Sequence, residues 1–194
     1  VQPLVQVKVL AINDFHGNLK PPQGGIRVRD AAGKLVNIDA GGAEHLATAV
    51  AQIRAKNPNH IFVAAGDLIG ATPLLSALFR DEPTIESLSL MGLEASSVGN
   101  HEFDKGAAEL LRMQNGGCHP TDLNSCKGLE VGTDYPFAGA KFKFLAANVE
   151  ETSSGKTIFP PYAIKTFGKT RVAFIGMTLK DTPSIVTPSG VAGL

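Results

Sequence analysis

The chain has 194 residues, 43% hydrophobic and 19% charged, and its 18 Lys and Arg residues balance its 18 Asp and Glu residues. This composition excludes an intrinsically disordered chain and predicts one globular domain with its own core and at most small insertions. The zero net charge argues against a protein held to nucleic acid or to an anionic membrane by bulk charge, and there is no apolar run of the roughly 18 residues that span a bilayer.

Short apolar strands alternate with amphipathic helices along the chain, which is typical of the α/β class. In chain order we expect a strand over 5–12, a Gly- and Pro-rich excursion or small hairpin over 20–41, a helix over 44–56, a strand over 61–65, helices over 73–79 and 84–91, a strand over 94–98, a helix over 105–114, a strand over 143–149, and a hairpin of 163–167 with 171–176. The first strand turns wholly apolar toward its end, so we expect that end to be buried.

Two cysteines lie close together, Cys118 and Cys126, in a segment of Gly, Pro, Asn, Asp and Ser residues. Their spacing does not match a CxxC redox or zinc pair. It favours a local disulfide that closes a surface loop in an oxidising compartment, with two free thiols as the alternative. The chain begins at Val1 without an initiator Met or a signal peptide, as expected after removal of an export signal, although a cut boundary would look the same.

A polar cluster follows each of the first three predicted strands. Asp14 and His16 come after the first strand, Asp67 after the second, and Asn100 and His101 after the third. Because the carboxyl ends of parallel strands share one edge of a sheet, we expect these side chains to converge there. Taken alone, the first two clusters are more typical of a turn or a helix cap, whereas the third, with an amide and an imidazole beside Gly99, is the sharpest signal. Together, their carboxylate, imidazole and amide groups suit zinc, manganese or iron.

The three clusters also resemble the leading signature of a known family. Asp-x-His, Gly-Asp and Gly-Asn-His-Glu, in this order, are similar to the motifs of the calcineurin-like metallophosphoesterases. The longer segments 10–18 and 98–104 resemble the 5'-nucleotidase branch, in particular its bacterial periplasmic 5'-nucleotidase and UDP-sugar hydrolase type. The resemblance implies a four-layer α/β/β/α sandwich with a centre of two divalent ions, Zn²⁺ or Mn²⁺, in a periplasmic or extracellular bacterial enzyme of nucleotide breakdown.

The resemblance also implies a role for each matching residue. Asp14 and His16 would bind the first metal, Asp67 would bridge both, and Asn100 would bind the second. Two cations held about 3.5–4 Å apart can clamp the attacking and leaving oxygens of a displacement. His101 would not be a ligand; it would contact the phosphoryl group or the leaving oxygen, oriented by Asp104. The alternative for Asp104 is a plain N-cap of the helix over 105–114, and a carboxylate can do both.

The remaining candidates have weaker signals. We expect His45, His60 and His119 to have surface or packing roles, and Asn148 to be a satisfied structural amide. The second half of the family's signature contains further histidines, but no histidine follows His119 in this chain. The resemblance therefore implies that residues 1–194 are the N-terminal part of the domain. The other ligands and a nucleoside-binding C-terminal domain would lie beyond Leu194, and this piece alone would bind metal weakly and be inactive.

The function implied is hydrolysis of a nucleoside 5'-monophosphate by a metal-bound hydroxide, assisted by His101 and Asp104. The alternatives are a 2',3'-cyclic nucleotide phosphodiesterase, a UDP-sugar or sulfur-ester hydrolase on the same core, and a non-catalytic domain. The expected partner is a nucleotide substrate, with no nucleic acid or membrane, and the sequence does not determine the oligomeric state.

Overall fold

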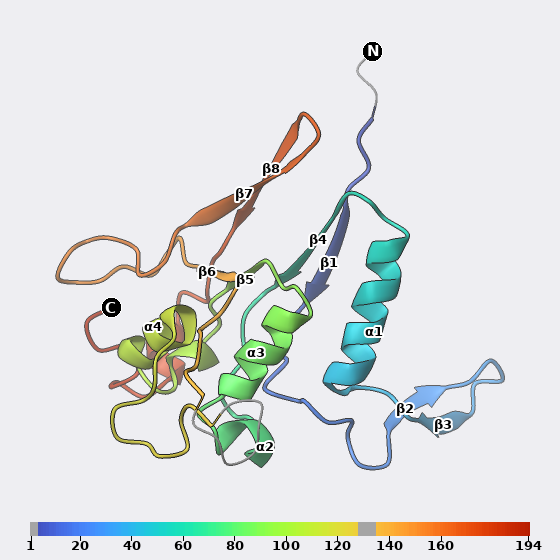
Figure 1. Ribbon diagram of the computed structural model, residues 1–194, viewed down its shortest axis with the longest axis horizontal. Coiled ribbons are helices and arrows are strands. Elements are labelled where there is room, and N and C mark those ends of the chain that lie inside the picture. The colour runs from blue at the N-terminus through green and yellow to red at the C-terminus, as the bar shows by residue number, and fades with distance from the viewer. Residues whose placement is uncertain (1–3, 128–134) are drawn as a thin grey trace.

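The computed structural model describes residues 4–127 and 135–194 (Figure 1). Its core is a four-stranded parallel sheet of order β1-β4-β5-β6. Two antiparallel hairpins, β2–β3 and β7–β8, lie outside this sheet. The strands are β1 (Lys8–Ile12), β2 (Ile26–Arg29), β3 (Leu35–Ile38), β4 (His60–Ala64), β5 (Ala95–Ser97), β6 (Lys143–Leu145), β7 (Tyr162–Phe167) and β8 (Thr170–Ile175). The helices are α1 (Gly42–Ala55), α2 (Leu74–Ala77), α3 (Glu82–Leu90), the 3₁₀ turn η1 (His101–Phe103), α4 (Ala107–Asn115) and α5 (Thr182–Ile185).

The expected alternation of strands and helices is confirmed, including the hairpin within residues 20–41. Several element boundaries differ from expectation by a few residues, and two of the differences have reasons that lie in the tertiary structure. The helix expected over 105–114 starts at Ala107 and has Gly106 as its N-cap, because Asp104 ends the preceding turn η1. The strand expected over 143–149 stops at Leu145, because the next two N–H groups donate to Pro160 O and Gly176 O outside the sheet.

The hydrophobic core lies between the sheet and helices α1, α3 and α4. Leu10, Phe62 and Phe144 project to this side, where Val50 of α1, Leu88 of α3 and Leu110 of α4 complete the cluster. On the other face, a groove of about 180 Å³ separates β8 from β4, β5 and β6. The layers are therefore helix, parallel sheet and hairpin, and this hairpin contributes the second β layer.

The expectation that the end of β1 is buried is wrong in part. Leu10 is buried, whereas Val9 is 48% exposed and Ala11 is also exposed. The reason is that β1 is an edge strand of the sheet, and only one of its faces is covered by helices. In the described residues, no helix combines the length and apolar character needed to cross a membrane.

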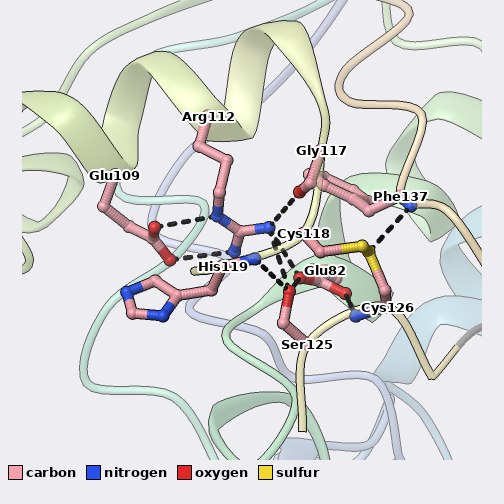
Figure 2. Close-up of a disulfide and its surroundings, with 9 residues drawn as sticks. All are labelled: Glu82, Glu109, Arg112, Gly117, Cys118, His119, Ser125, Cys126 and Phe137. Carbon is pink, nitrogen blue, oxygen red and sulfur yellow. Dashed lines mark hydrogen bonds and ion pairs between the residues drawn. A yellow bond between two sulfur atoms is a disulfide. The ribbon is translucent and has the colours of Figure 1, made fainter. Parts of the chain in front are cut away.

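The disulfide between Cys118 and Cys126 is present, with their Cα atoms 5.4 Å apart, which confirms the expected pairing (Figure 2). Cys126 is only 5% exposed, because its loop is fastened to the helices beneath it. The buried Glu82 carboxylate accepts hydrogen bonds from Cys126 N at 2.7 Å, from Ser125 Oγ at 2.5 Å and from Arg112 Nη1 at 2.7 Å. The loop therefore lies at the surface, as expected, and its Ser125–Cys126 end is anchored in the core.

Glu109 on α4 forms a second set of ion pairs at the same place. It contacts Arg80 Nε at 3.0 Å and Arg112 Nε at 2.8 Å. Burial raises the pKa of Glu109, but the hydrogen bonds and charges of Arg112 and Arg80 outweigh it, so the pKa lies below its ordinary value. The ionised form of Glu109 thus stabilises the fold.

Candidate metal centre

The three polar clusters follow β1, β4 and β5, which are adjacent parallel strands, so they meet at one edge of the sheet. Asp14 N donates to Gly66 O at 3.2 Å, and His16 N donates to Asp67 O at 3.0 Å. Asp14, His16 and Asp67 all have positive φ, between 45° and 52°. Left-handed backbone is costly for residues with a Cβ, and it persists at functional sites where the surroundings enforce it. All three candidate ligands on these loops are held in this way.

His16 is oriented by a backbone carbonyl. Its Nδ1 lies 2.8 Å from Gly70 O, so this nitrogen carries the proton and Nε2 keeps a free lone pair. Nε2 lies 3.8 Å from Asp14 Oδ1. A hydrogen bond from the other ring nitrogen is the usual support for a metal-binding imidazole. Asp14 and His16 can therefore offer one oxygen and one nitrogen to the same cation.

Asp67 is held by a buried carboxylate that the sequence reasoning did not single out. Glu102 is 2% exposed and accepts hydrogen bonds from the backbone N–H of Asp67 at 2.8 Å, Leu68 at 2.8 Å and Gly99 at 2.6 Å. Burial raises the pKa of Glu102 to about 7, although these hydrogen bonds lower it. In the sequence, Glu102 is marked only by its position directly after Asn100 and His101, and that position does not indicate which amides its carboxylate binds.

Two glycines allow the second and third loops to approach each other. A Cβ on Gly99 would lie 2.1 Å from Asp67 Oδ1, and one on Gly66 would lie 2.4 Å from Gly99 N. Both distances are shorter than any contact a real Cβ makes. Glycine at these positions lets Asp67 rest directly against the backbone of the third loop, where its Oδ1 accepts the His101 N–H at 3.0 Å.

His101 and Asp104 form the pair that the resemblance implies. His101 Nδ1 lies 2.8 Å from Asp104 Oδ2, and this hydrogen bond raises the pKa of His101 against the opposing effect of burial. The negative charges of Asp104, Asp67 and Glu102 raise it further. The His101 ring packs edge-on against His16, with the ring centroids 4.8 Å apart. Because Nδ1 of each ring is already hydrogen-bonded, Nε2 is the nitrogen that each ring has left for another partner. Asp104 is not the N-cap of α4, a role that falls to Gly106.

The donor set fits a divalent cation. His16, Asp67 and His101 each offer a ligand atom, and these atoms lie within 4.8 Å of one another. The carboxamide of Asn100 has one terminal atom 3.3 Å from Asp67 Oδ2 and the other 3.3 Å from His101 N. Without a cation, hydrogen bonding favours the amide nitrogen beside Asp67. A cation shared with Asp67 would favour the amide oxygen there instead.

The other histidines have partners away from this edge, as expected. His45 and His60 bond through Nδ1 to Gly41 O and Asn57 O, and His119 Nδ1 accepts from the backbone of Asp122. The Asn148 amide is satisfied by Thr178, donating to its carbonyl at 2.9 Å and accepting from its N–H at 3.0 Å. These four side chains therefore have structural contacts that need no ligand.

Residues 7–168 match the family described as calcineurin-like phosphoesterase. The chain belongs to this family. An uncharacterised protein in the pqq-V 5' region of Acinetobacter calcoaceticus is 48% identical over 84% of this chain and 79% of its own length. Endonuclease YhcR of Bacillus subtilis is 33% identical to this chain, over 100% of this chain and 15% of its own length. Cell wall protein Lmo0130 of Listeria monocytogenes is 35% identical, over 94% of this chain and 23% of its own length.

Solved structures of calcineurin-like phosphoesterase relatives share the fold. The NAD nucleotidase NadN of Haemophilus influenzae superposes with a TM-score of 0.69 and 26% identity, over 92% of this chain and 27% of its own. A 5'-nucleotidase precursor from Thermus thermophilus superposes with a TM-score of 0.66 and 26% identity, over 94% of this chain and 31% of its own. The chain thus spans less than a third of both proteins. The expected metallophosphoesterase sandwich is confirmed for the part of the domain that the chain covers.

Proposed function

We propose that this chain carries metal ligands and the proton-donating pair of a nucleotide phosphohydrolase. The observation that carries the proposal is the meeting of Asp14, His16, Asp67, Asn100 and His101 at one sheet edge of a calcineurin-like phosphoesterase. Divalent cations, Zn²⁺ or Mn²⁺, would polarise a phosphoryl group and activate water there. Asp14 and His16 would hold one cation, Asn100 the other, and Asp67 would contact both.

His101 would act on the substrate rather than on a cation. Its hydrogen bond to Asp104 favours the protonated ring and aims Nε2 into the site. During hydrolysis, the oxygen of water forms a bond to phosphorus and gives up one proton to solvent, the ester P–O bond breaks, and the Nε2 proton passes to the leaving oxygen. The ring then takes a proton from solvent. Positive charge on the ring also stabilises the phosphoryl oxygens. Asp104 would act through His101 by orienting it.

Nucleotides are the proposed substrate class. The names of NadN and of the Thermus 5'-nucleotidase support this class, and a nucleoside 5'-monophosphate remains our first candidate. A nucleic-acid phosphodiester is the second candidate, because the relative YhcR, matched over 100% of this chain, is named an endonuclease. That an accompanying domain holds the nucleoside remains a prediction, supported by the greater length of both solved relatives.

An exported location is the proposed setting. The Cys118–Cys126 disulfide needs an oxidising compartment to persist, and the relative Lmo0130 is named a cell wall protein.

The proposal is tested by metal content and hydrolysis together. The full-length protein that contains this domain is dialysed against Zn²⁺ and Mn²⁺, its bound metal is measured by elemental analysis, and AMP, UDP-glucose, 2',3'-cyclic AMP and single-stranded DNA are assayed. Asp67→Asn should lower metal content and rate together. His101→Ala should keep the metal while the rate falls about 10²–10⁴-fold. Loss of metal in His101→Ala would make His101 a ligand, and wild-type protein without bound metal would refute the proposal.

A further inference from the structure

A buried carboxylate outside every sequence motif lies behind the metal-site loops. Asp81 is 1% exposed. Its Oδ1 accepts hydrogen bonds from Thr72 Oγ1 at 2.6 Å and Ser76 Oγ at 3.0 Å, and its Oδ2 accepts from Lys105 Nζ at 2.8 Å. Its own backbone is left-handed, with φ of 67°. A buried carboxylate with three donors and a costly backbone conformation indicates a position that the surrounding structure strongly constrains.

The donors to Asp81 contact the loops of the site on two sides. On one side, a Cβ on Gly17 would lie 2.6 Å from Thr72 Cγ2, so Gly17, the neighbour of His16, rests directly on Thr72. On the other side, Lys105 follows Asp104, which holds His101. The first and second metal loops are also joined by backbone hydrogen bonds from His16 N to Asp67 O and from Gly17 N to Leu68 O, both 3.0 Å.

We propose that Asp81 is a positioning residue for the metal centre. Through Thr72 it fixes the second metal loop against Gly17 and thereby against His16, and through Lys105 it fixes the turn that carries His101. The inference rests on the proposed function, because it assigns Asp81 a role toward that site. Asp81 itself touches none of the proposed ligands in the described hydrogen bonds, and it would act only through its partners.

The charge of Asp81 is essential to this arrangement, not only its shape. An Asn at position 81 could still accept from Thr72 and Ser76 with its oxygen, but its NH₂ group would then face the Lys105 ammonium. With the amide reversed, its oxygen could accept from Lys105 and its NH₂ could donate to the Thr72 and Ser76 hydroxyls, so the contacts remain but Lys105 no longer faces a negative charge. In both orientations Asp81→Asn weakens the side of the clamp that faces Lys105, because the ammonium loses its charge-assisted hydrogen bond to a carboxylate.

The next residue supplies a matched control. Glu82 is also a buried carboxylate, 4% exposed, but its hydrogen bonds go to Arg112 and the disulfide loop (Figure 2). Glu82→Gln removes the same charge from the same helix end as Asp81→Asn and should destabilise the fold without loosening the metal loops. The pair therefore separates positioning of the site from general loss of stability.

The deciding measurement is amide hydrogen exchange in the metal-free protein. Relative to the slowest-exchanging core amides, we expect the amides of His101 and Asp104, in the turn next to Lys105, to exchange at least about tenfold faster in Asp81→Asn than in wild type, and unchanged in Glu82→Gln. Equal changes in both variants, or none in Asp81→Asn, would refute the positioning role. If Asp81→Asn does not fold, Lys105→Met and Thr72→Val decide the question, since each removes one bond and leaves Asp81 in place.

Metal affinity distinguishes failure of this inference from failure of the proposed function. In calorimetric titration with Mn²⁺, we expect Asp81→Asn to bind at least about tenfold more weakly than Glu82→Gln, which should match wild type. Wild-type protein that binds no Mn²⁺ or Zn²⁺ would refute the proposed function, while the exchange data would still decide the role of Asp81. Metal binding that is equal in all three proteins would refute the role of Asp81 alone.

Discussion

Replacing Glu102 by Gln tests how the second and third metal loops are held together. The Glu102 carboxylate accepts the N–H groups of Asp67 and Gly99 on Oε2 and that of Leu68 on Oε1. A glutamine oxygen in the Oε2 position would keep two of these bonds. Its NH₂ group would then face the Leu68 N–H, so that two buried donors would meet without an acceptor between them.

The expected cost follows from this count. A buried polar group left without a partner costs about 1–3 kcal/mol, so two such groups cost about 2–6 kcal/mol. The total stability of a domain is about 5–15 kcal/mol, so Glu102→Gln should remain folded at 25 °C but lose much of its margin. The Leu68 amide should also lose protection against hydrogen exchange, since it loses its acceptor.

Urea unfolding followed by circular dichroism at pH 8.5, where the Glu102 carboxylate is ionised because the pH lies above its pKa of about 7, measures this cost in the metal-free protein. Glu44→Gln, at an exposed carboxylate on α1, is the control for the chemical change itself and should shift the unfolding free energy by less than about 0.5 kcal/mol. If Glu102→Gln unfolds within that same margin of wild type, the carboxylate does not hold the loops, and the reasoning from the three hydrogen bonds is wrong.

Three further perturbations have outcomes that follow from the structure. Gly70→Ala should lower stability and disturb the His101–Asp104 pair, because φ is 81° there and a Cβ would lie 2.6 Å from Asp104 Oδ2; the NMR titration of the His101 ring reports it. Replacing Cys118 and Cys126 by serine should cost about 2.5 kcal/mol in urea unfolding, the loop-entropy value for so short a loop; an unchanged midpoint would contradict this. The pKa of Glu109 is lower in the folded than in the unfolded protein, so its stabilisation is present above pH 4.5 and is lost as the pH falls through the folded value. Glu109→Gln should therefore flatten the decline of stability below pH 4.5, and a decline as steep as in wild type would refute the assignment.

Much of the fold was predictable from local patterns. The strand–helix alternation and both hairpins follow from hydrophobic periodicity and from the positions of Gly and Pro, which act within a few residues. The boundaries that were missed depend on distant partners. β6 ends at Leu145 because the following amides donate to Pro160 O and Gly176 O, which no local pattern announces.

The sequence by itself predicted the candidate donors and their convergence at the carboxyl edge of the sheet, because the spacing of Asp14, His16 and Asp67 after apolar strands is a local property. Only the tertiary structure decided how these donors are held. Glu102 accepts hydrogen bonds from amides about 35 residues earlier in the chain. Asp81 joins Thr72, which precedes it in the chain, to Lys105, which follows it. A buried carboxylate is recognised by the donors that surround it, and those donors are brought together by the packing of the chain rather than by its order.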